Sequence, residues 1–344
     1  MIAAPQHRPR PLPLFLDLLR RETAGDPERL ARALAGLRRY QEAPRRPPEP
    51  PRPPVAERAG VVLRDYGGDG PAVVVVPSLI NPPTVLDLSP GASLLAWLAS
   101  QGWRVLLVDW GEPCPERRRL TLTGHVEEIL LPLLDGLPQP PLVAGYCLGG
   151  TMALAVAASR PVRALALIAA PWHFAAYGRE RAQLARLWDS AAPLSQPLGL
   201  LPMEVLQSAF WSLDPARTVA KFERFADLEA EQAEAFVALE DWANDGPPLP
   251  FPAAQELFQS FIGADASGRG RWFVSGRAVD PSRLEVPVLN ILSSVDRITP
   301  AASAAGVGQR LHVDLGHVGM IVGRGARAGL WEPLRDWMKD VAPR

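Results

Sequence analysis

The sequence has 344 residues, of which 47% are hydrophobic, so it can bury one large core and is not a disulfide-stapled miniature domain. Its formal net charge is −1, so no basic excess favours nucleic acid or an anionic membrane as a partner. Only two cysteines occur, Cys114 and Cys147, which suits a reducing cytoplasm.

The N-terminal residues 1–13 lack the apolar core of a signal peptide, so we expect a cytoplasmic protein. The longest uncharged run, residues 137–159, has the length of a membrane span. Its prolines and its glycines at 145, 149 and 150 instead favour a strand, a turn and a helix. The sequence therefore predicts no membrane span.

Two amphipathic helices are predicted within residues 12–42, with Asp26 as the N-cap and Pro27 in the first helical position of the second. We expect the chain's own core to cover their apolar faces, and a partner helix is the alternative. Residues 43–54, APRRPPEPPRPP, should form an extended polyproline strap, which acts as a spacer or as a ligand for a proline-recognition module. Residues 1–55 are thus predicted as N-terminal helices and a Pro/Arg-rich strap.

From about residue 61 onward, apolar strands alternate with helical stretches. The predicted strands are residues 73–76, 104–108, 142–146, 162–169, 286–292 and 310–314, and the predicted helices are 93–101, 123–134, 151–158 and 325–341. Strands that are apolar throughout are buried on both faces, which predicts an α/β fold with a mostly parallel, doubly covered sheet. Residues 56–171 and 284–344 form this core. Residues 172–283 are rich in aromatics without a clear strand, and predict an inserted helical cap.

Cys147 lies in the sequence Gly145-Tyr-Cys-Leu-Gly-Gly150, between a predicted strand and a predicted helix. This arrangement is typical of the sharp turn that presents a nucleophile in α/β-hydrolase folds. Glycines two positions away on either side avoid collisions of the strained turn with the neighbouring strand and helix. The start of the helix favours a thiolate, and the backbone N–H of Leu148 is the predicted oxyanion donor. An isolated cysteine between glycines is more often a buried structural residue, so the catalytic interpretation depends on an acid and a base elsewhere.

The acid and the histidine follow a nucleophile of this kind in that order, each after a strand. Here one predicted strand leads to Asp296 and the next leads to His317. We expect His317 to accept the thiol proton and Asp296 to orient the imidazole. Asp314 is the alternative acid, but it is only three residues from the histidine on the same strand.

A second oxyanion donor is predicted in the loop that follows the first core strand, residues 77–81. The amide of Leu79 or of Ile80 would supply it. Which of the two amides acts stays open from the sequence.

Several motifs resemble those of the polyhydroxyalkanoate synthases, which belong to the α/β-hydrolase superfamily. They are, in the family's order, ValProSerLeuIleAsn at 76–81, ValAspTrpGly at 108–111, GlyTyrCysLeuGlyGly at 145–150, Trp242-Ala-Asn-Asp245, ValProValLeuAsnIle at 286–291 and GlyHisValGly at 316–319. The resemblance covers roughly residues 60–340. The AspTrpGly segment and the length are most similar to the shorter synthases that work with a second subunit.

The resemblance implies that Cys147 takes a 3-hydroxyacyl group from coenzyme A and passes it to the hydroxyl of a growing polyester, poly-3-hydroxybutyrate or a related polymer. It also implies a second synthase subunit or a homodimer as partner, and a location in the cytoplasm or at polyester granules. No cofactor besides the acyl-CoA substrate is expected. The scattered histidines and the cysteine spacing predict no metal site.

The chain departs from the family where Arg297 follows the predicted acid, since the synthases usually carry a histidine there. A cysteine hydrolase or thioesterase similar to dienelactone hydrolase is the main alternative, because that enzyme carries the same turn sequence. Dienelactone hydrolase, however, lacks a large insertion between nucleophile and acid. A catalytically silent homologue that binds polyester granules through an apolar cap is a further alternative.

Overall fold

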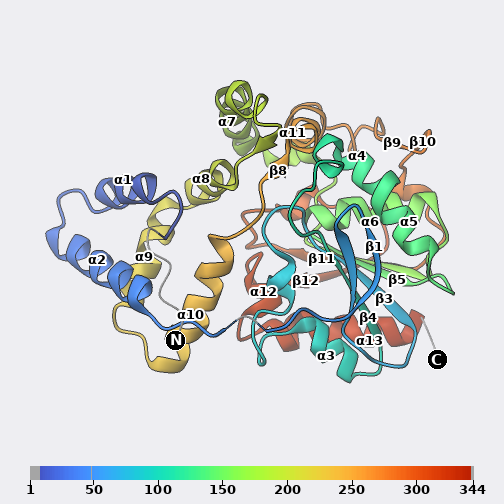
Figure 1. Cartoon of the computed structure of the whole chain (residues 1–344), viewed down its shortest axis with the longest axis horizontal. Coiled ribbons are helices and arrows are strands. Elements are labelled where there is room, and N and C mark those ends of the chain that lie inside the picture. The colour runs from blue at the N-terminus through green and yellow to red at the C-terminus, as the bar shows by residue number, and fades with distance from the viewer. Residues whose placement is uncertain (1–7, 48, 342–344) are drawn as a thin grey trace. The chain divides into compact units, whose positions relative to one another are not determined.

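The computed structural model describes residues 8–47 and 49–341, which form two compact units (Figure 1). The sheet unit comprises the described residues of Pro51–Leu201 and Pro247–Arg344, and the helical unit comprises those of Met1–Pro50 and Pro202–Gly246. Each unit therefore consists of chain segments that are separated in the sequence.

The centre of the sheet unit is an eight-stranded sheet. Its strands, in spatial order, are β1 (Pro54–Arg58), β2 (Val61–Asp65), β4 (Arg104–Asp109), β3 (Ala72–Val76), β5 (Leu142–Tyr146), β6 (Ala164–Ile168), β11 (Val288–Ser293) and β12 (Gln309–Val313). From β4 to β12 all neighbours pair in parallel, and only β1–β2 and β2–β4 are antiparallel. The apolar residues of β5 and β6 are buried throughout, as expected for strands covered on both faces. The predicted α/β fold with a mostly parallel sheet is confirmed.

Helices cover both faces of this sheet, with α3 and α13 on one face and α5 and α6 on the other (Figure 1). The helices of the sheet unit are α3 (Leu94–Ser100), α4 (Leu122–His125), α5 (Leu131–Asp135), α6 (Leu148–Ser159), α7 (Arg179–Ser195), α11 (Phe251–Gln255), α12 (Gly319–Val322) and α13 (Glu332–Val341), with π-helical segments at Val126–Leu130, Glu256–Gly263 and Arg327–Trp331. Helix α6 is apolar all round, so it is buried on all sides except at its C-terminal end. None of the helices in the described part of the chain combines the length and the apolar character that a bilayer crossing requires.

Strands β1 and β2 and four very short strands were not predicted from the sequence. Strand β1 begins at Pro54, inside the predicted strap, and pairs antiparallel with β2. It is an edge strand, where prolines are tolerated. The region predicted to lack strands contains two antiparallel pairs, β7 (Leu200–Leu201) with β8 (Leu249–Pro250), and β9 (Phe273–Val274) with β10 (Arg277–Ala278).

The helical unit is held together by an aromatic core. Its helices are α1 (Leu12–Glu22), α2 (Pro27–Glu42), α8 (Met203–Leu213), α9 (Pro215–Phe225) and α10 (Ala230–Ala243). Phe15 of α1 and Tyr40 of α2 both pack edge-on against Phe222 of α9 at 5.0 and 5.8 Å between ring centroids. The apolar faces of the N-terminal helices are thus covered by the chain's own core, and this prediction is confirmed.

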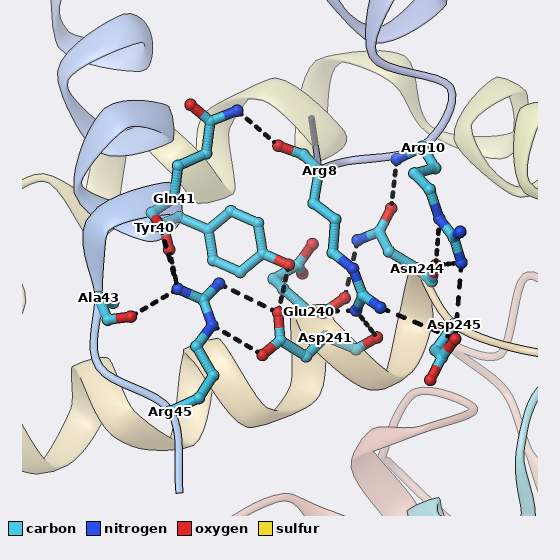
Figure 2. A network of polar contacts seen from close by, with 10 residues as sticks. All are labelled: Arg8, Arg10, Tyr40, Gln41, Ala43, Arg45, Glu240, Asp241, Asn244 and Asp245. Atoms are coloured by element: carbon cyan, nitrogen blue, oxygen red, sulfur yellow. Dashed lines mark hydrogen bonds and ion pairs between the residues drawn. The ribbon is translucent and has the colours of Figure 1, made fainter. Parts of the chain in front are cut away.

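Polar contacts tie the N-terminal segments to the C-terminal end of α10 (Figure 2). The carboxylate of Asp241 accepts hydrogen bonds from Arg45 at 2.9 and 3.1 Å and from the Tyr40 hydroxyl at 2.7 Å. The backbone N–H of Arg10 donates to the Asn244 side chain at 3.1 Å. Asp241 thus holds Tyr40 and Arg45, and Asn244 of the Trp-x-Asn-Asp segment at 242–245 holds Arg10.

The two units divide the chain differently from the three predicted segments. Residues 202–246, the middle of the predicted cap, belong with the N-terminal helices, whereas residues 172–201 and 247–283 belong with the sheet. The physical reason is the aromatic core, since the rings of α9 and α10 bury their surface against α1 and α2.

Candidate active site

Cys147 lies at the tip of a strained turn between β5 and α6. Its backbone has φ 55° and ψ −130°, a conformation that residues with a side chain rarely adopt. A Cβ atom on Gly149 would lie 2.2 Å from the carbonyl oxygen of Val76, and one on Gly145 would lie 2.4 Å from the Cα of Gly150. The glycine spacing thus has the steric cause that the sequence predicted.

The start of α6 presents backbone amides beside this cysteine. Leu148 is the first residue of the helix, so its N–H has no acceptor within the helix. The Cys147 N–H itself donates to the carbonyl of Ile168 at 2.9 Å, which fixes the turn to the neighbouring strand β6. The Leu148 amide therefore stays the candidate for the first oxyanion donor.

The structure brings Asp296 and His317 together from two loops that follow β11 and β12. His317 Nδ1 lies 2.7 Å from Asp296 Oδ2, and both side chains are buried. The other carboxylate oxygen of Asp296 accepts the backbone N–H groups of Ile298 and Thr299 at 2.8 and 2.9 Å. Because the carboxylate accepts the Nδ1–H of the ring, Nε2 is left to face a substrate or a nucleophile.

The alternative acid, Asp314, does not have this position. It is exposed and accepts a hydrogen bond from the Ser294 hydroxyl at 3.2 Å. Of the two carboxylates considered from the sequence, only Asp296 is hydrogen-bonded to the imidazole of His317.

The side chain of Cys147 lies beside the same imidazole. Burial alone lowers the pKa of His317, but the charges of Cys147 and Asp296 and the hydrogen bonds to both outweigh burial and raise it. The imidazolium form is thus stabilised between a sulfur and a carboxylate. Cys147 as a whole is half-buried.

The loop predicted to supply a second oxyanion donor begins at Pro77, directly after β3. The Ile80 amide donates to the Ser78 hydroxyl at 3.0 Å, so it is engaged within the loop. This contact favours the amide of Leu79 over that of Ile80 as the second donor. A Cβ on Gly149 would lie 2.4 Å from the Pro77 carbonyl oxygen, so the loop and the start of α6 are in direct contact.

Two tyrosines, Tyr146 and Tyr177, were not predicted from the sequence as part of the surroundings of Cys147. The ring of Tyr146 stacks on the His317 imidazole with 5.0 Å between centroids, and its hydroxyl donates to the His317 carbonyl at 3.2 Å. Burial, and then the charge of Cys147, raise the pKa of Tyr146 and of Tyr177. Only the position of Tyr146 directly before Cys147 gave a signal in the sequence.

Arg297, the departure from the synthase pattern, is exposed on the loop after β11. The neighbouring Asp296 therefore keeps its contact with the histidine although the next residue differs. Within residues 8–47 and 49–341, no cluster of three or more histidine, cysteine or acidic side chains has the arrangement of a metal site.

A family model for the alpha/beta hydrolase fold matches residues 71–311, well over half of the chain. Among solved structures, a protein named as the non-heme bromoperoxidase BpoC from Mycobacterium tuberculosis superposes with a TM-score of 0.50 at 17% identity, covering 82% of this chain and 96% of its own. At that identity the likeness concerns the fold alone.

Curated relatives include the poly(3-hydroxyalkanoate) polymerase subunits PhaC of Haloferax mediterranei, 30% identical over 78% of this chain, and of Synechocystis, 26% identical over 78%. The chain covers 77% of the Synechocystis protein. It covers only 58% of the Haloferax protein and 64% of its Haloarcula marismortui counterpart. The resemblance to the polyhydroxyalkanoate synthases found in the motifs is confirmed by these relatives.

Proposed function

Because this chain belongs to the α/β-hydrolase fold family, we propose that it is a polyhydroxyalkanoate synthase-like acyltransferase with Cys147, His317 and Asp296 as catalytic residues. One observation carries the proposal: Cys147 lies on the strained turn beside an imidazole that Asp296 orients at 2.7 Å. The names of the curated relatives support polyester synthesis as the reaction.

In the first half-reaction, His317 holds the thiol proton while the sulfur of Cys147 attacks the carbonyl carbon of a 3-hydroxyacyl-CoA. The amides of Leu148 and Leu79 stabilise the negative oxygen of the tetrahedral intermediate. Its collapse breaks the bond to coenzyme A, and His317 returns the proton to the leaving sulfur. An acyl thioester on Cys147 remains, close in energy to the thioester consumed.

In the second half-reaction, His317 takes the proton from the terminal hydroxyl of a polyester chain, and the hydroxyl oxygen attacks the acyl group on Cys147. The bond to the cysteine breaks, the proton returns to the sulfur, and the chain has grown by one unit. This chemistry requires no cofactor or metal. The proposal includes a homodimer or a second synthase subunit as partner, and a place in the cytoplasm or at the polyester surface.

The test compares the two cysteines of the chain. The parent protein is mixed with 3-hydroxybutyryl-CoA, and both free coenzyme A and the acyl product are measured. Cys147→Ala should abolish coenzyme A release, whereas Cys114→Ala should leave it unchanged, because the Cys114 thiol contacts the Ala59 carbonyl at 3.2 Å and has no part in the mechanism.

The product separates the alternatives. A polyester supports the synthase proposal, and free 3-hydroxybutyrate alone indicates a thioesterase on the same site. Iodoacetamide should alkylate Cys147 rapidly at neutral pH if His317 activates it. Slow alkylation together with no coenzyme A release would contradict the proposal in favour of a silent homologue.

A further inference from the structure

The AspTrpGly motif lies at the C-terminal end of β4, and Cys147 follows the C-terminal end of β5 in the same sheet. The proposed reaction does not use this motif. Trp110 follows this strand directly and is only 2% exposed. Its indole Nε1–H donates to the carbonyl oxygen of Pro77 at 3.0 Å. Pro77 is the first residue after β3, the strand next to β4, and it opens the second oxyanion loop.

The position of the Pro77 carbonyl determines where the next residues of this loop can lie. Its peptide group is planar, so fixing the oxygen also fixes the Ser78 N–H on the other side of the bond and limits where Leu79 can lie. The same carbonyl packs against Gly149, one residue after Leu148, so closely that a Cβ on this glycine would lie 2.4 Å from the oxygen. The hydrogen bond from Trp110 therefore acts where the two proposed oxyanion donors approach each other.

The backbone of Trp110 is itself held by a buried cation. The guanidinium of Arg117, 2% exposed, donates from Nη1 to the Trp110 carbonyl and from Nη2 to the Gly111 carbonyl at 2.7 Å. This fork fixes the backbone of the motif in a way that a lysine cannot reproduce. Because the backbone of Trp110 is fixed, the indole N–H keeps its orientation toward the Pro77 carbonyl.

A neutral histidine completes the support of the indole. The ring of His125 meets that of Trp110 edge-on at 5.9 Å, and its Nδ1 lies 2.7 Å from the Thr121 carbonyl. Burial lowers the pKa of His125 to about 4, so the ring is neutral and Nδ1 carries the proton. His125 therefore packs against the indole without accepting its N–H, since its Nε2 has no hydrogen-bond partner in the described residues and the indole donates to Pro77.

From this geometry we infer that Trp110 is a positioning residue for acyl transfer, because its indole N–H sets the place of the Leu79 amide relative to Leu148. The inference rests on the proposed function and adds a residue to it. Trp110 touches neither Cys147 nor substrate in the proposed mechanism. Loss of its N–H should weaken the stabilisation of the oxyanion without changing the nucleophile.

The test replaces Trp110 with phenylalanine, which keeps the apolar ring and removes the N–H. The kcat for coenzyme A release from 3-hydroxybutyryl-CoA should fall by about tenfold or more, with KM changed less than twofold. The rate of Cys147 alkylation by iodoacetamide should stay within about twofold of the parent, because alkylation forms no oxyanion.

Trp97→Phe is the matched control, since the buried indole nitrogen of Trp97 has no hydrogen-bond partner in the described part of the chain. It should leave kcat, KM and alkylation unchanged. If Trp110→Phe fails to fold, replacement of Trp110 by benzothienylalanine removes the N–H while it keeps the shape of the ring system. The same fall in kcat as for Trp110→Phe is then expected.

Parent-like turnover in the Trp110 variants, or a parallel fall of alkylation and turnover, overturns the inference. The acylation burst with 4-nitrophenyl butyrate separates this outcome from failure of the proposed function. If the parent gives the burst but releases no coenzyme A, the substrate assignment is wrong. The burst still reports whether Trp110 supports the oxyanion.

Discussion

The imidazole of His317 is fixed by several contacts that have different effects. Asp296 binds Nδ1 with one oxygen, and its other oxygen is held by two loop amides, so the acid cannot rotate away. Tyr146 stacks on the ring and binds the backbone carbonyl of the same histidine. The ring is therefore held in orientation before any substrate arrives, which is the condition for efficient proton transfer.

Asp296→Asn should reduce kcat for coenzyme A release by roughly 10² to 10⁴, because an amide no longer stabilises the imidazolium or selects the ring tautomer. Steady-state kinetics with 3-hydroxybutyryl-CoA measures the effect. Asp314→Asn is the matched control and should be silent, since Asp314 is exposed and binds Ser294. A silent Asp296→Asn together with a damaging Asp314→Asn would exchange the two assignments.

The raised pKa of His317 also predicts a pH dependence of stability. In the unfolded chain the histidine titrates near pH 6.5, so its stabilising charge is fully present below about that pH. This contribution is lost as the pH rises through the higher folded pKa, which Cys147 and Asp296 cause. The difference in unfolding free energy between the parent and His317→Gln should therefore be larger at pH 6 than at pH 10.

Urea unfolding at both pH values measures this difference. His312→Gln serves as the control, because His312 is exposed on β12. A gap between parent and His317→Gln that widens as the pH rises would show that the histidine is held neutral in the folded state.

The chain order of Cys147, Asp296 and His317 was enough to predict which side chains meet, because each follows a strand of one parallel sheet. The stacking of Tyr146 and the Trp110 hydrogen bond could not be predicted. Both depend on where loops from different strands meet, and no local pattern in the sequence records such a meeting.

At the turn that carries Cys147, the backbone of the neighbouring strand β3 and its loop requires a glycine at position 149 of α6. Gly149 has helical geometry, in which alanine would normally be the better residue by about 1 kcal/mol. Here an alanine Cβ would meet two backbone carbonyl oxygens, those of Val76 and Pro77, at 2.2 and 2.4 Å. Backbone atoms in a buried sheet cannot move aside at low cost. The steric cost therefore exceeds the gain in helix propensity, and alanine at position 149 is destabilising.

Gly149→Ala should destabilise the protein by about 2 to 4 kcal/mol and abolish the proposed acyl transfer, since the loop that carries the proposed second oxyanion donor is pushed away from α6. Thermal unfolding and turnover measure the two effects. Gly91→Ala is the control, because a Cβ there meets no atom within 4 Å. Gly149→Ala with parent stability would mean that β3 and α6 pack less tightly than described.

The core strands and helices could be predicted because continuous apolar runs and capping residues are local signals. Strand β1 was not predicted, because its proline and charged residues are typical of a strap, and only its pairing with β2 makes it a strand. The short pairs β7–β8 and β9–β10 carry too few residues for any periodicity.

The helical unit joins two segments that lie far apart in the sequence. Phe222 is fully buried and contacts the rings of Phe15, Tyr40 and Phe236 at 5.0 to 5.8 Å. The periodicity of α1 and α2 showed which faces are apolar, but it could not show that α9 and α10 cover them. This pairing is why the predicted N-terminal region and cap do not coincide with the observed units.

Phe222→Ala should remove about 3 to 5 kcal/mol from the stability of the helical unit, through lost burial and the cavity that remains. Amide hydrogen exchange should then accelerate together in residues 12–42 and 203–243, while the strands of the sheet unit keep their protection. Leu34→Ala, at a side chain that is 42% exposed, should change little. Equal acceleration across both units would show that the two unfold as one.

The composition of the helical unit has a consequence for biosynthesis. Helices α1 and α2 leave the ribosome before α8–α10, and the rings that cover them are made only after α2 and roughly 160 further residues. At about 5 to 20 residues per second, this leaves the nascent helices without their cover for about ten to thirty seconds. During that interval Phe15 and Tyr40 are open to chaperones that bind apolar segments, and a fast-translated messenger would shorten the exposure.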